Sequence, residues 1–209
     1  MESAAQGLTV DKAHVWRGDR HVLQGVSLEL RSRELLQVAG ANGSGKTTLL
    51  RVACGLLRPE QGSVAWCGRS IASIRTEFQC ALAYAAHEPA LKGDLTPLEN
   101  LRYLVGLKRR VGTPELQAAL ERTGVGACAQ LPVRVLSAGQ RRRVAMARVL
   151  AMRSALWILD EPFTNLDSAG SQLVSALLGE HVNGGGMALV VAHHELRVAA
   201  SMRRLELQG

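Results

Sequence analysis

The residues best suited to chemistry form a glycine-rich segment, residues 40–47, with the spacing GxxxxGK(S/T). In order, its members are Gly40, Ala41, Asn42, Gly43, Ser44, Gly45, Lys46 and Thr47. Glycines let consecutive backbone N–H groups turn toward phosphate oxygens, Lys46 would bring a cation to the outer phosphates, and the Thr47 hydroxyl could ligate Mg²⁺. An apolar run precedes the segment and a helix-like run from Thr48 follows it. This context predicts a site for a nucleoside triphosphate rather than an incidental glycine-rich turn.

A pair of carboxylates, Asp160 and Glu161, directly follows another apolar run. Transfer of a phosphoryl group to water needs an acid beside Mg²⁺ and a base for the attacking water. We expect Asp160 to serve the metal together with Thr47, and Glu161 to act as the base. An acidic turn at the end of a strand, before Pro162, is the alternative, and the phosphate loop makes the functional interpretation the stronger one.

Continuous apolar runs indicate the elements that would position these groups. They occupy residues 35–39, 81–86, 155–159 and 187–192. Runs without alternation are typical of parallel strands buried on both faces, so an α/β fold is predicted. Polar residues follow each run, among them His87 and His193. Because open α/β sheets bind ligands at the carboxyl ends of their strands, we expect these side chains to converge with the phosphate loop on one nucleotide.

The segment LSAGQ, residues 136–140, supports two compatible interpretations. Ser137 and Gln140 form an SxxQ capping box that would open a helix reaching Met152. A helix N-terminus beside Gly139 is also an anion site, so the segment could hold a phosphate that belongs to a second copy of the protein.

Length and composition indicate one domain, residues 1–209. The chain has 209 residues, of which 47% are hydrophobic and 21% charged, as in ordinary globular proteins. No apolar run approaches the roughly 18 residues of a membrane span, and the first residues do not resemble a signal peptide, so we expect a cytoplasmic chain. No CxxC pair occurs among the four cysteines, so neither a zinc site nor a disulfide framework is expected.

A net charge of +7 favours an acidic partner without deciding between nucleic acid, an anionic membrane surface and the nucleotide itself. Aromatic residues make up 3% of the chain and show no base-stacking pattern, so a nucleic-acid partner is not expected. The basic runs at residues 108–110 and 141–143 are expected on solvated helix faces.

In the order and spacing of these motifs the chain resembles ATP-binding cassette (ABC) ATPases. The resemblance covers residues 8–207, and its specificity comes from the LSxGQ segment just ahead of ILDEP. It implies a P-loop NTPase fold of the ABC type, with a mostly parallel sheet core, an antiparallel β subdomain and a helical subdomain inserted at about residues 90–150. It also implies that two copies sandwich two ATP molecules head to tail.

The resemblance assigns roles within one copy. Lys46 would bind the β- and γ-phosphates, with Thr48 and the rest of the loop around them, and Thr47 and Asp160 would hold Mg²⁺. Glu161 would polarise the attacking water, and His193 would contact the γ-phosphate as the switch histidine.

Further roles concern the second copy and three departures from the family pattern. Ser137 and Gly139 would contact the γ-phosphate of the opposite copy, and Asp167 would lie in the loop that links the two sites.

Ala138 replaces the usual glycine and is expected to have an ordinary negative φ. His87 stands where the family has a catalytic glutamine, and its imidazole could still accept or relay a hydrogen bond. For adenine stacking Trp16 is the candidate, and a surface or core tryptophan is the open alternative.

The chain most resembles the ATPase subunits of bacterial haem exporters of cytochrome c maturation. Residues 136–145, residues 156–164 and His87 carry this resemblance. It implies ATP hydrolysis on the cytoplasmic face of the bacterial inner membrane, in association with integral-membrane subunits. No CxxCH pattern occurs, so haem is not expected to be bound directly.

Three alternatives stay open. The chain could serve another small ABC permease, or it could be a soluble ABC ATPase acting on DNA or ribosomes. Such soluble members carry a long coiled-coil insertion or two cassettes in one chain, and neither feature occurs here. A phosphate-loop kinase would leave the LSxGQ segment without an explanation.

Overall fold

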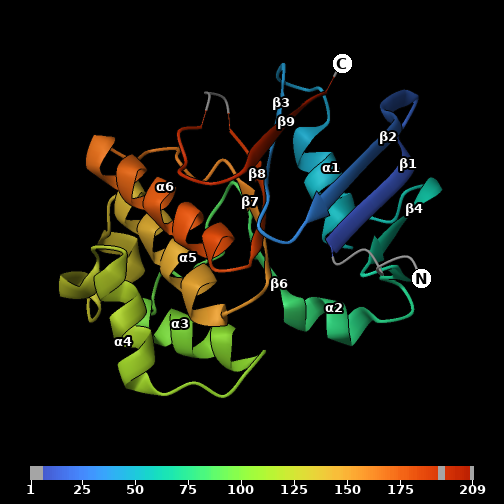
Figure 1. Ribbon diagram of the computed structural model, residues 1–209. Helices are drawn as coiled ribbons and strands as arrows, with labels where there is room; N and C mark the ends of the chain where they lie inside the picture. Colours follow the sequence, from blue (N-terminus) through green and yellow to red (C-terminus); the bar gives the residue numbers. More distant parts are fainter. Residues whose placement is uncertain (1–6, 193–195, 208–209) are drawn as a thin grey trace.

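The computed structural model describes residues 7–192 and 196–207, and its centre is a five-stranded sheet (Figure 1). Its strands lie in the order β6-β7-β8-β3-β9, and every neighbouring pair is parallel. Their bounds are β3 (Leu35–Gly40), β6 (Leu82–Ala85), β7 (Leu156–Asp160), β8 (Met187–Val191) and β9 (Met202–Leu207). The four predicted apolar runs all become strands of this sheet, and the predicted parallel core is therefore confirmed. The edge strand β9 is an addition.

Hydrophobic side chains on both faces explain why these runs form central strands. All five residues of β7 are buried, and successive residues alternate between two separate hydrophobic clusters. Leu156 and Ile158 pack in the cluster that also contains α1 (Lys46–Ala53), whereas Trp157 and Leu159 pack in the cluster beneath α6 (Ser168–Asn183). A strand sandwiched in this way needs apolar residues along its length, and Asp160, the last residue of β7, is the buried polar exception.

A second, antiparallel sheet covers α1 on the side away from the parallel sheet (Figure 1). Its strands lie in the order β2-β1-β4-β5. Their bounds are β1 (Gly7–Arg17), β2 (Arg20–Arg31), β4 (Gln61–Trp66) and β5 (Arg69–Ser70), with the short helix α2 (Arg75–Ala81) following. The apolar faces of β1 and β2 share one cluster with α1 and the parallel strands, so the antiparallel part is held by the same core as the phosphate loop.

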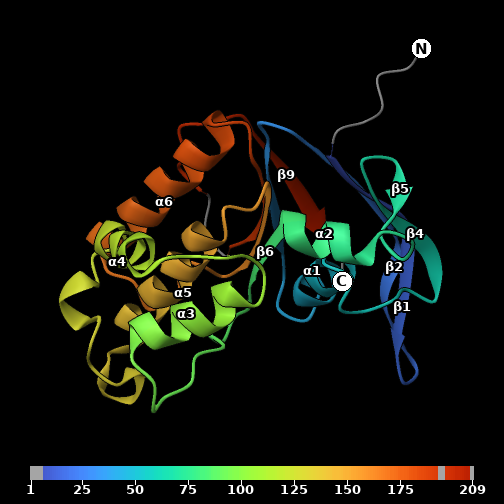
Figure 2. The ribbon, with the colours of Figure 1, turned by 90° about the horizontal axis from the view of Figure 1, so that it is seen from below.

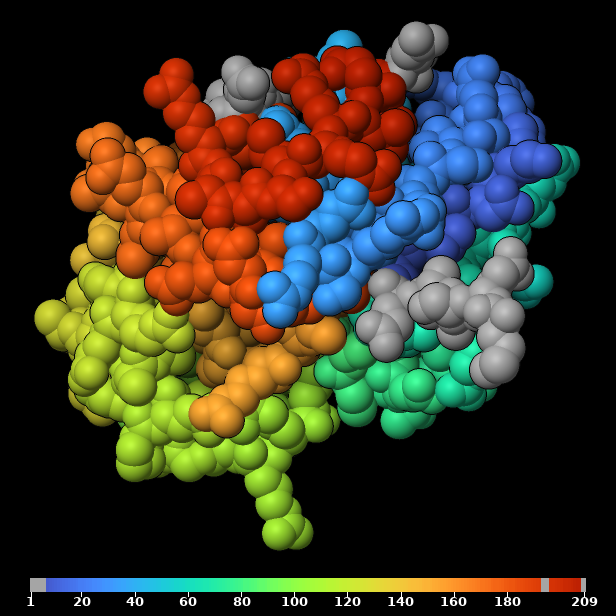
Figure 3. Space-filling view, viewed as in Figure 1, coloured from blue at the N-terminus to red at the C-terminus, as the bar shows by residue number. Residues whose placement is uncertain are grey.

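The helical part lies on the opposite flank of the molecule from the antiparallel strands (Figures 2 and 3). It consists of α3 (Pro97–Gly106), α4 (Thr113–Arg122), the 3-10 turns η1 (Gly126–Cys128) and η2 (Val133–Val135), and α5 (Ala138–Met152). These elements enclose a third cluster of their own. Met146 and Val149 of α5 also pack in the cluster beneath α6, so α5 joins the helical part to the sheet. No helix among the described residues is long and apolar enough to cross a membrane.

Candidate functional site

The loop between β3 and α1 is shaped by glycines that approach other backbone closely. Gly43 and Gly45 have φ values of 80° and 95°, in the left-handed region that favours glycine. A Cβ atom at Gly40 would come within 2.6 Å of the carbonyl oxygen of Leu207, and one at Gly45 within 2.9 Å of the Leu23 side chain. Gly43 is therefore required by backbone conformation, and space excludes a larger residue at Gly40 and Gly45.

Lys46 lies at the centre of this loop, at the start of α1. The residue is 7% exposed, and Nζ donates hydrogen bonds of 2.8 Å to the carbonyl oxygens of Gly40 and Ala41. The first turn of α1 contains no acidic residue, so its free N–H groups and the ammonium form a concentrated positive site. Of the remaining loop residues, Asn42 is exposed, whereas Ser44 and Thr48 are buried.

The next two groups, Thr47 and Asp160, are brought together from α1 and the end of β7. The Thr47 hydroxyl donates a 2.9 Å hydrogen bond to Oδ2 of Asp160. Asp160 is 2% exposed, and within the described residues its Oδ1 atom has no hydrogen-bond partner. Burial raises the pKa of Asp160, against the opposing effect of the Thr47 hydrogen bond. A hydroxyl and a carboxylate with a spare buried oxygen fit a hard cation such as Mg²⁺, which prefers oxygen ligands.

Glu161 follows in a strained conformation. Its φ is 51°, a left-handed value that costs a non-glycine residue roughly 1–3 kcal/mol, and its N–H donates to the carbonyl oxygen of Val191 at 3.0 Å. The carboxylate Oε2 accepts a 3.1 Å hydrogen bond from the Thr164 hydroxyl. A strained backbone at an acidic residue next to Asp160 supports a functional position for the Glu161 side chain.

His87 reaches the same carboxylate from the end of β6. Its Nε2 atom lies 3.4 Å from Oε2 of Glu161. The predicted convergence at the carboxyl ends of the strands thus applies to Thr47, Asp160, Glu161 and His87. The other histidine predicted for this edge, His193, lies outside the described residues.

The LSAGQ segment forms the N-terminus of α5, with the capping box expected from the sequence. The Ser137 hydroxyl accepts from the Gln140 N–H at 3.1 Å, and the Gln140 side-chain oxygen accepts from the Ser137 N–H at 2.8 Å. Ala138 is the first residue of the helix and has no left-handed φ, which confirms the expectation. A Cβ atom at Gly139 would come within 2.7 Å of the carbonyl oxygen of Asn165.

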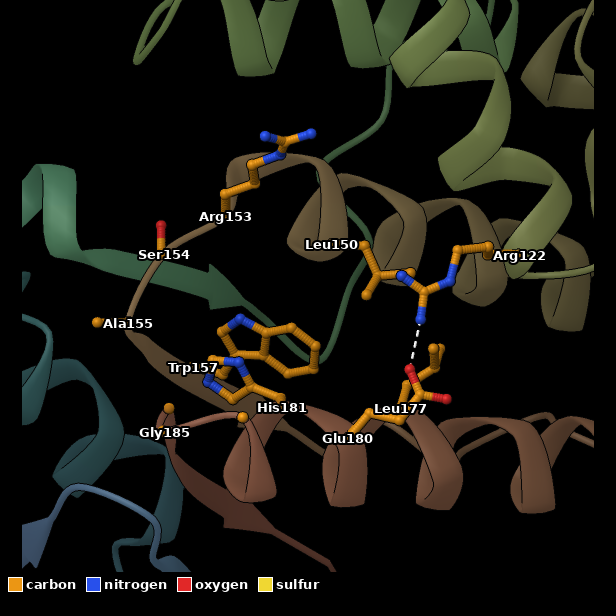
Figure 4. A pocket seen from close by; sticks show the side chains of 12 residues that line it. Arg122, Leu150, Arg153, Ser154, Ala155, Trp157, Leu177, Glu180, His181 and Gly185 are labelled. Carbon is orange, nitrogen blue, oxygen red and sulfur yellow. Dashed lines mark hydrogen bonds and ion pairs between the residues drawn. The ribbon is translucent and has the colours of Figure 1, made fainter.

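The residues predicted to contact the γ-phosphate of the opposite copy line a cavity of about 390 Å³. A second cavity, of about 520 Å³, lies apart from it (Figure 4). The smaller cavity brings together Ser137, Gly139 and Asp167, and Arg143 also lines it. Asp167 caps α6, because its side chain accepts from the Gly170 N–H at 2.7 Å. No residue of the loop at 40–47 lines this cavity.

The cavity of Figure 4 lies at the amino ends of β7 and β8, away from the motif residues. The rings of Trp157 and His181 stack there at a centroid distance of 3.9 Å, and Arg122 pairs with Glu180 at 2.5 Å. Burial lowers the pKa of His181. This arrangement offers no glycine loop for phosphates, so it does not compete with the site at residues 40–47.

Trp16 lies on the hairpin of β1 and β2, and one face of its indole is already occupied. The His21 ring stacks on it at 3.9 Å, and His21 is in turn 3.0 Å from the His14 ring nitrogen. Adenine stacking on Trp16 therefore stays a prediction. This hairpin contacts the phosphate loop through Arg20, whose Nη2 donates to the carbonyl oxygen of Gly43 at 2.8 Å.

Sequence reasoning missed two further residues at the site. Arg20 gave no signal, because a surface arginine in a hairpin is common. Arg142 belongs to the basic run that was expected on a solvated helix face, and this expectation is wrong, because Arg142 is 4% exposed. Its guanidinium donates to the backbone carbonyl oxygens of Ala86 and His87.

Comparison with known proteins agrees with this geometry. The ABC transporter family matches residues 23–164. The cytochrome c biogenesis ATP-binding export protein CcmA of Methylococcus capsulatus is 47% identical over 192 residues, which cover 91% of this chain and 93% of that protein. The protein of the same name from Nitrosococcus oceani is 44% identical over 209 residues, covering 100% of this chain and 95% of that protein. The Escherichia coli K12 protein is 40% identical over 192 residues, covering 91% of each.

Solved structures show the same fold. A bacterial ABC transporter cassette, described as dimeric, superposes with a TM-score of 0.84 at 23% identity, covering 95% of this chain and 94% of that one. The ATP-binding subunit of another ABC transporter gives a TM-score of 0.81 at 24% identity, covering 90% of this chain and 79% of that one. The predicted cassette fold and the predicted resemblance to cytochrome c biogenesis proteins are thus confirmed. This chain belongs to the ABC transporter family, in the group of the cytochrome c biogenesis ATP-binding export proteins.

Proposed function

We propose that this chain is the ATP-hydrolysing subunit of a bacterial haem exporter that serves cytochrome c biogenesis. The ATPase proposal rests on one observation: four side chains lie together beside the phosphate loop. The Thr47 hydroxyl contacts Asp160, and the His87 ring lies beside Glu161, the residue that follows Asp160. The names of its relatives support the export role in cytochrome c biogenesis. Haem as the cargo follows from the sequence resemblance, and the subunit itself is not proposed to bind it.

Binding of ATP would use the positive site around Lys46. Phosphate oxygens would replace the carbonyls of Gly40 and Ala41 as acceptors for the ammonium, and loop N–H groups would donate to the remaining oxygens. Thr47 and Asp160 would hold Mg²⁺, which when bound neutralises charge on the β- and γ-phosphates. The raised pKa of Asp160 reflects a carboxylate that is poorly solvated and therefore gains from a nearby cation.

Hydrolysis would use Glu161 as the group that orients the attacking water and accepts its proton. The water oxygen attacks the γ-phosphorus, the bond to the β-phosphate oxygen breaks, and ADP and inorganic phosphate leave. Thr164 donates to Oε2 of Glu161, and the His87 ring lies 3.4 Å from the same atom, so the two contacts would restrain the carboxylate before the water arrives. His193 is proposed to contact the γ-phosphate on the basis of the sequence resemblance.

A second copy of the chain is proposed to complete each site. The cavity of Ser137, Gly139 and Asp167 combines a helix N-terminus with Arg143 in its lining, and the Asp167 carboxylate there already accepts from the Gly170 N–H, so an anion would be favoured by the first two. This chain's own phosphate loop does not line that cavity, so the γ-phosphate that it receives would be held by the partner copy. A solved cassette of the same fold is described as dimeric.

Integral-membrane subunits are proposed as the other partners, on the cytoplasmic face of the bacterial inner membrane. This proposal rests on the export role in the names of the relatives. A cassette for another small permease would share every feature of the site, so only the identity of the partners separates the two functions.

The experiment on catalysis compares Glu161→Gln with Glu121→Gln, an exposed carboxylate on α4. Glu161→Gln should keep ATP binding, slow hydrolysis on the order of 10²- to 10⁴-fold through loss of the base, and accumulate a dimer when ATP is present. Glu121→Gln should hydrolyse ATP like the parent chain. Turnover of Glu161→Gln at the parent rate would remove Glu161 from its role.

The experiment on partners uses the same variant as a trap. The tagged Glu161→Gln chain is purified from native membranes with ATP in mild detergent, and proteins that copurify are identified by mass spectrometry. Membrane subunits of a haem exporter support the proposal. A different permease would leave the ATPase assignment intact but refute haem export, and ribosomal or DNA-bound partners without membrane proteins would refute the transporter assignment.

A further inference from the structure

Arg142 is a buried cation in the first turns of α5. Its Nη1 and Nη2 atoms donate to the carbonyl oxygens of Ala86 and His87, at 3.2 and 2.5 Å. Within the described residues its Nε atom finds no acceptor. A guanidinium so placed is costly, because two neutral carbonyls replace most of its water.

The electrostatic surroundings of Arg142 connect it to the hydrolytic carboxylates. Burial lowers the pKa of Arg142, and the negative charges of Glu161 and Asp160 oppose this effect. The cation is thus near enough to both carboxylates to interact with them, yet its hydrogen bonds go to the segment that carries His87.

Residues 86 and 87 reach Glu161 through the side chain of His87. The backbone of His87 is held by Arg142, and its ring lies 3.4 Å from Oε2 of Glu161. The helix that carries Arg142 begins at the Ser137 cap, less than two turns away. One rigid helix therefore connects the cavity proposed for the partner's phosphate with the histidine beside the proposed base.

We propose that Arg142 is a positioning residue for hydrolysis, whose forked guanidinium fixes residues 86 and 87 and thereby holds the His87 ring against Glu161. The inference rests on the proposed ATPase function and adds a residue to it. It also explains why an arginine is buried here, since a planar group with several donors can bind two successive carbonyls where a single ammonium cannot.

Arg148 provides a matched comparison on the same helix. It is also buried, with 7% exposed, and its Nη2 donates to the carbonyl oxygen of Tyr84 at 2.8 Å. Burial lowers the pKa of Arg148 as well, but no carboxylate contributes. Arg148 therefore holds β6 to α5, as Arg142 holds the two residues after β6, but Arg148 has no connection to His87 and Glu161.

The test is a double-mutant cycle in the full chain, assembled with its membrane partners. The variants are Arg142→Gln, His87→Ala, the two combined, and the same set with Arg148→Gln in place of Arg142→Gln. The measurements are kcat, the Kd for ATP and the thermal unfolding midpoint. Arg142→Gln should lower kcat about tenfold or more, because misplacement of reacting groups is costly, and change the Kd for ATP by less than about twofold.

Coupling between the two residues separates a positioning role from a structural one. If Arg142 acts through His87, the combined variant should turn over no more slowly than the slower single variant. Arg148→Gln should lower the unfolding midpoint, leave kcat near the parent value and combine additively with His87→Ala. Where Arg142→Gln fails to fold, Arg142→Lys keeps the charge, loses the fork and enters the same cycle.

Two results would overturn the inference. In the first, the increases in activation free energy caused by the Arg142 and His87 substitutions add up in the combined variant. In the second, kcat falls in proportion to the loss of the unfolding midpoint, to the same extent in the Arg142 and Arg148 variants. Glu161→Gln is measured in parallel, since turnover that does not need Glu161 would refute the proposed site itself. Turnover that needs Glu161 together with additive losses would refute the role of Arg142 alone.

Discussion

Asp160 shows at the scale of one side chain why a bound cation is proposed for this site. One carboxylate oxygen accepts from Thr47, and among the described residues the other has no partner. The cost falls on the ionised form, because burial opposes charge more strongly than one hydroxyl supports it. The site is thus less stable alone than it would be with an uncharged residue.

This cost predicts the effect of Asp160→Asn on stability. Because the pKa of Asp160 is raised in the folded state, the protonated acid favours folding at low pH. This contribution to the free energy of unfolding is lost as pH rises through the raised pKa. Asn keeps an acceptor for Thr47 without the charge, so the variant should unfold at a higher temperature than the parent at pH 8, by roughly 2–4 °C if the gain is about 1 kcal/mol. The difference should shrink toward pH 4, and Mg²⁺ with ATP should stabilise the variant less than the parent.

Thermal unfolding at several pH values, with and without Mg²⁺ and ATP, measures both effects. The exposed Asp19→Asn serves as the control and should show neither. A variant of Asp160 that is less stable than the parent at pH 8 would contradict the assigned burial cost.

At the scale of elements, α3 and α5 begin with the same device, and a second task is proposed only for the cap of α5. Thr96 caps α3 by accepting from the Glu99 N–H at 3.2 Å, and Ser137 caps α5 by accepting from the Gln140 N–H at 3.1 Å. Both are complete capping boxes. Only the cap of α5 also lines the cavity proposed for the partner's phosphate.

The pair of caps allows stability to be separated from function. Ser137→Ala and Thr96→Ala should each lower the unfolding free energy by about 1 kcal/mol, because each removes one capping hydrogen bond. Only Ser137→Ala should also slow ATP hydrolysis and weaken the ATP-dependent dimer. Denaturant unfolding and turnover of the two variants side by side check this. Equal loss of turnover in both would mean that Ser137 acts only as a cap.

Basic residues on α5 and just after α3 were harder to place than the caps. Besides Arg142, Lys108 belongs to a run expected in solvent, yet its ammonium is half-buried and donates to the carbonyl oxygens of Gln79 and Leu82. Long basic side chains can lie along apolar surface and reach carbonyls at the far side. A run of like residues does not reveal which member does so.

At the scale of the whole molecule, the proposed site is divided between two copies. The phosphate loop and the carboxylates belong to one half, and the cavity with Ser137, Gly139 and Asp167 belongs to the other. A symmetric dimer would bring unlike halves together twice.

Mixing two inactive variants tests this division. Lys46→Ala disables the loop, and Gly139→Asp disables the cavity, because even a Cβ atom there would approach the Asn165 carbonyl oxygen to 2.7 Å. An equal mixture should recover about a quarter of the parent activity if pairing is random and the sites act independently. Mixing Lys46→Ala with the double variant should recover nothing. Absence of recovery at every ratio of the two single variants would contradict the composite site.

The sequence by itself determined the elements and motifs whose structure is local. The glycine loop, the buried strands and the Ser137 cap follow from backbone freedom, apolar runs and residue spacing, all of which can be read along the chain. It also indicated that Thr47 and Asp160 would meet, because Asp160 ends one parallel strand and Thr47 follows the loop that leaves the end of another.

Only the tertiary structure decided which side chains contact each other across long separations. The ring of His87 lies beside Glu161, and Arg142 is buried against residues 86 and 87, although their own neighbours in the sequence do not require either contact. The edge strand β9 mixes polar and apolar residues without a continuous apolar run, and it becomes a strand by pairing with β3. These features depend on packing between distant elements, and that packing exists only once the chain has folded.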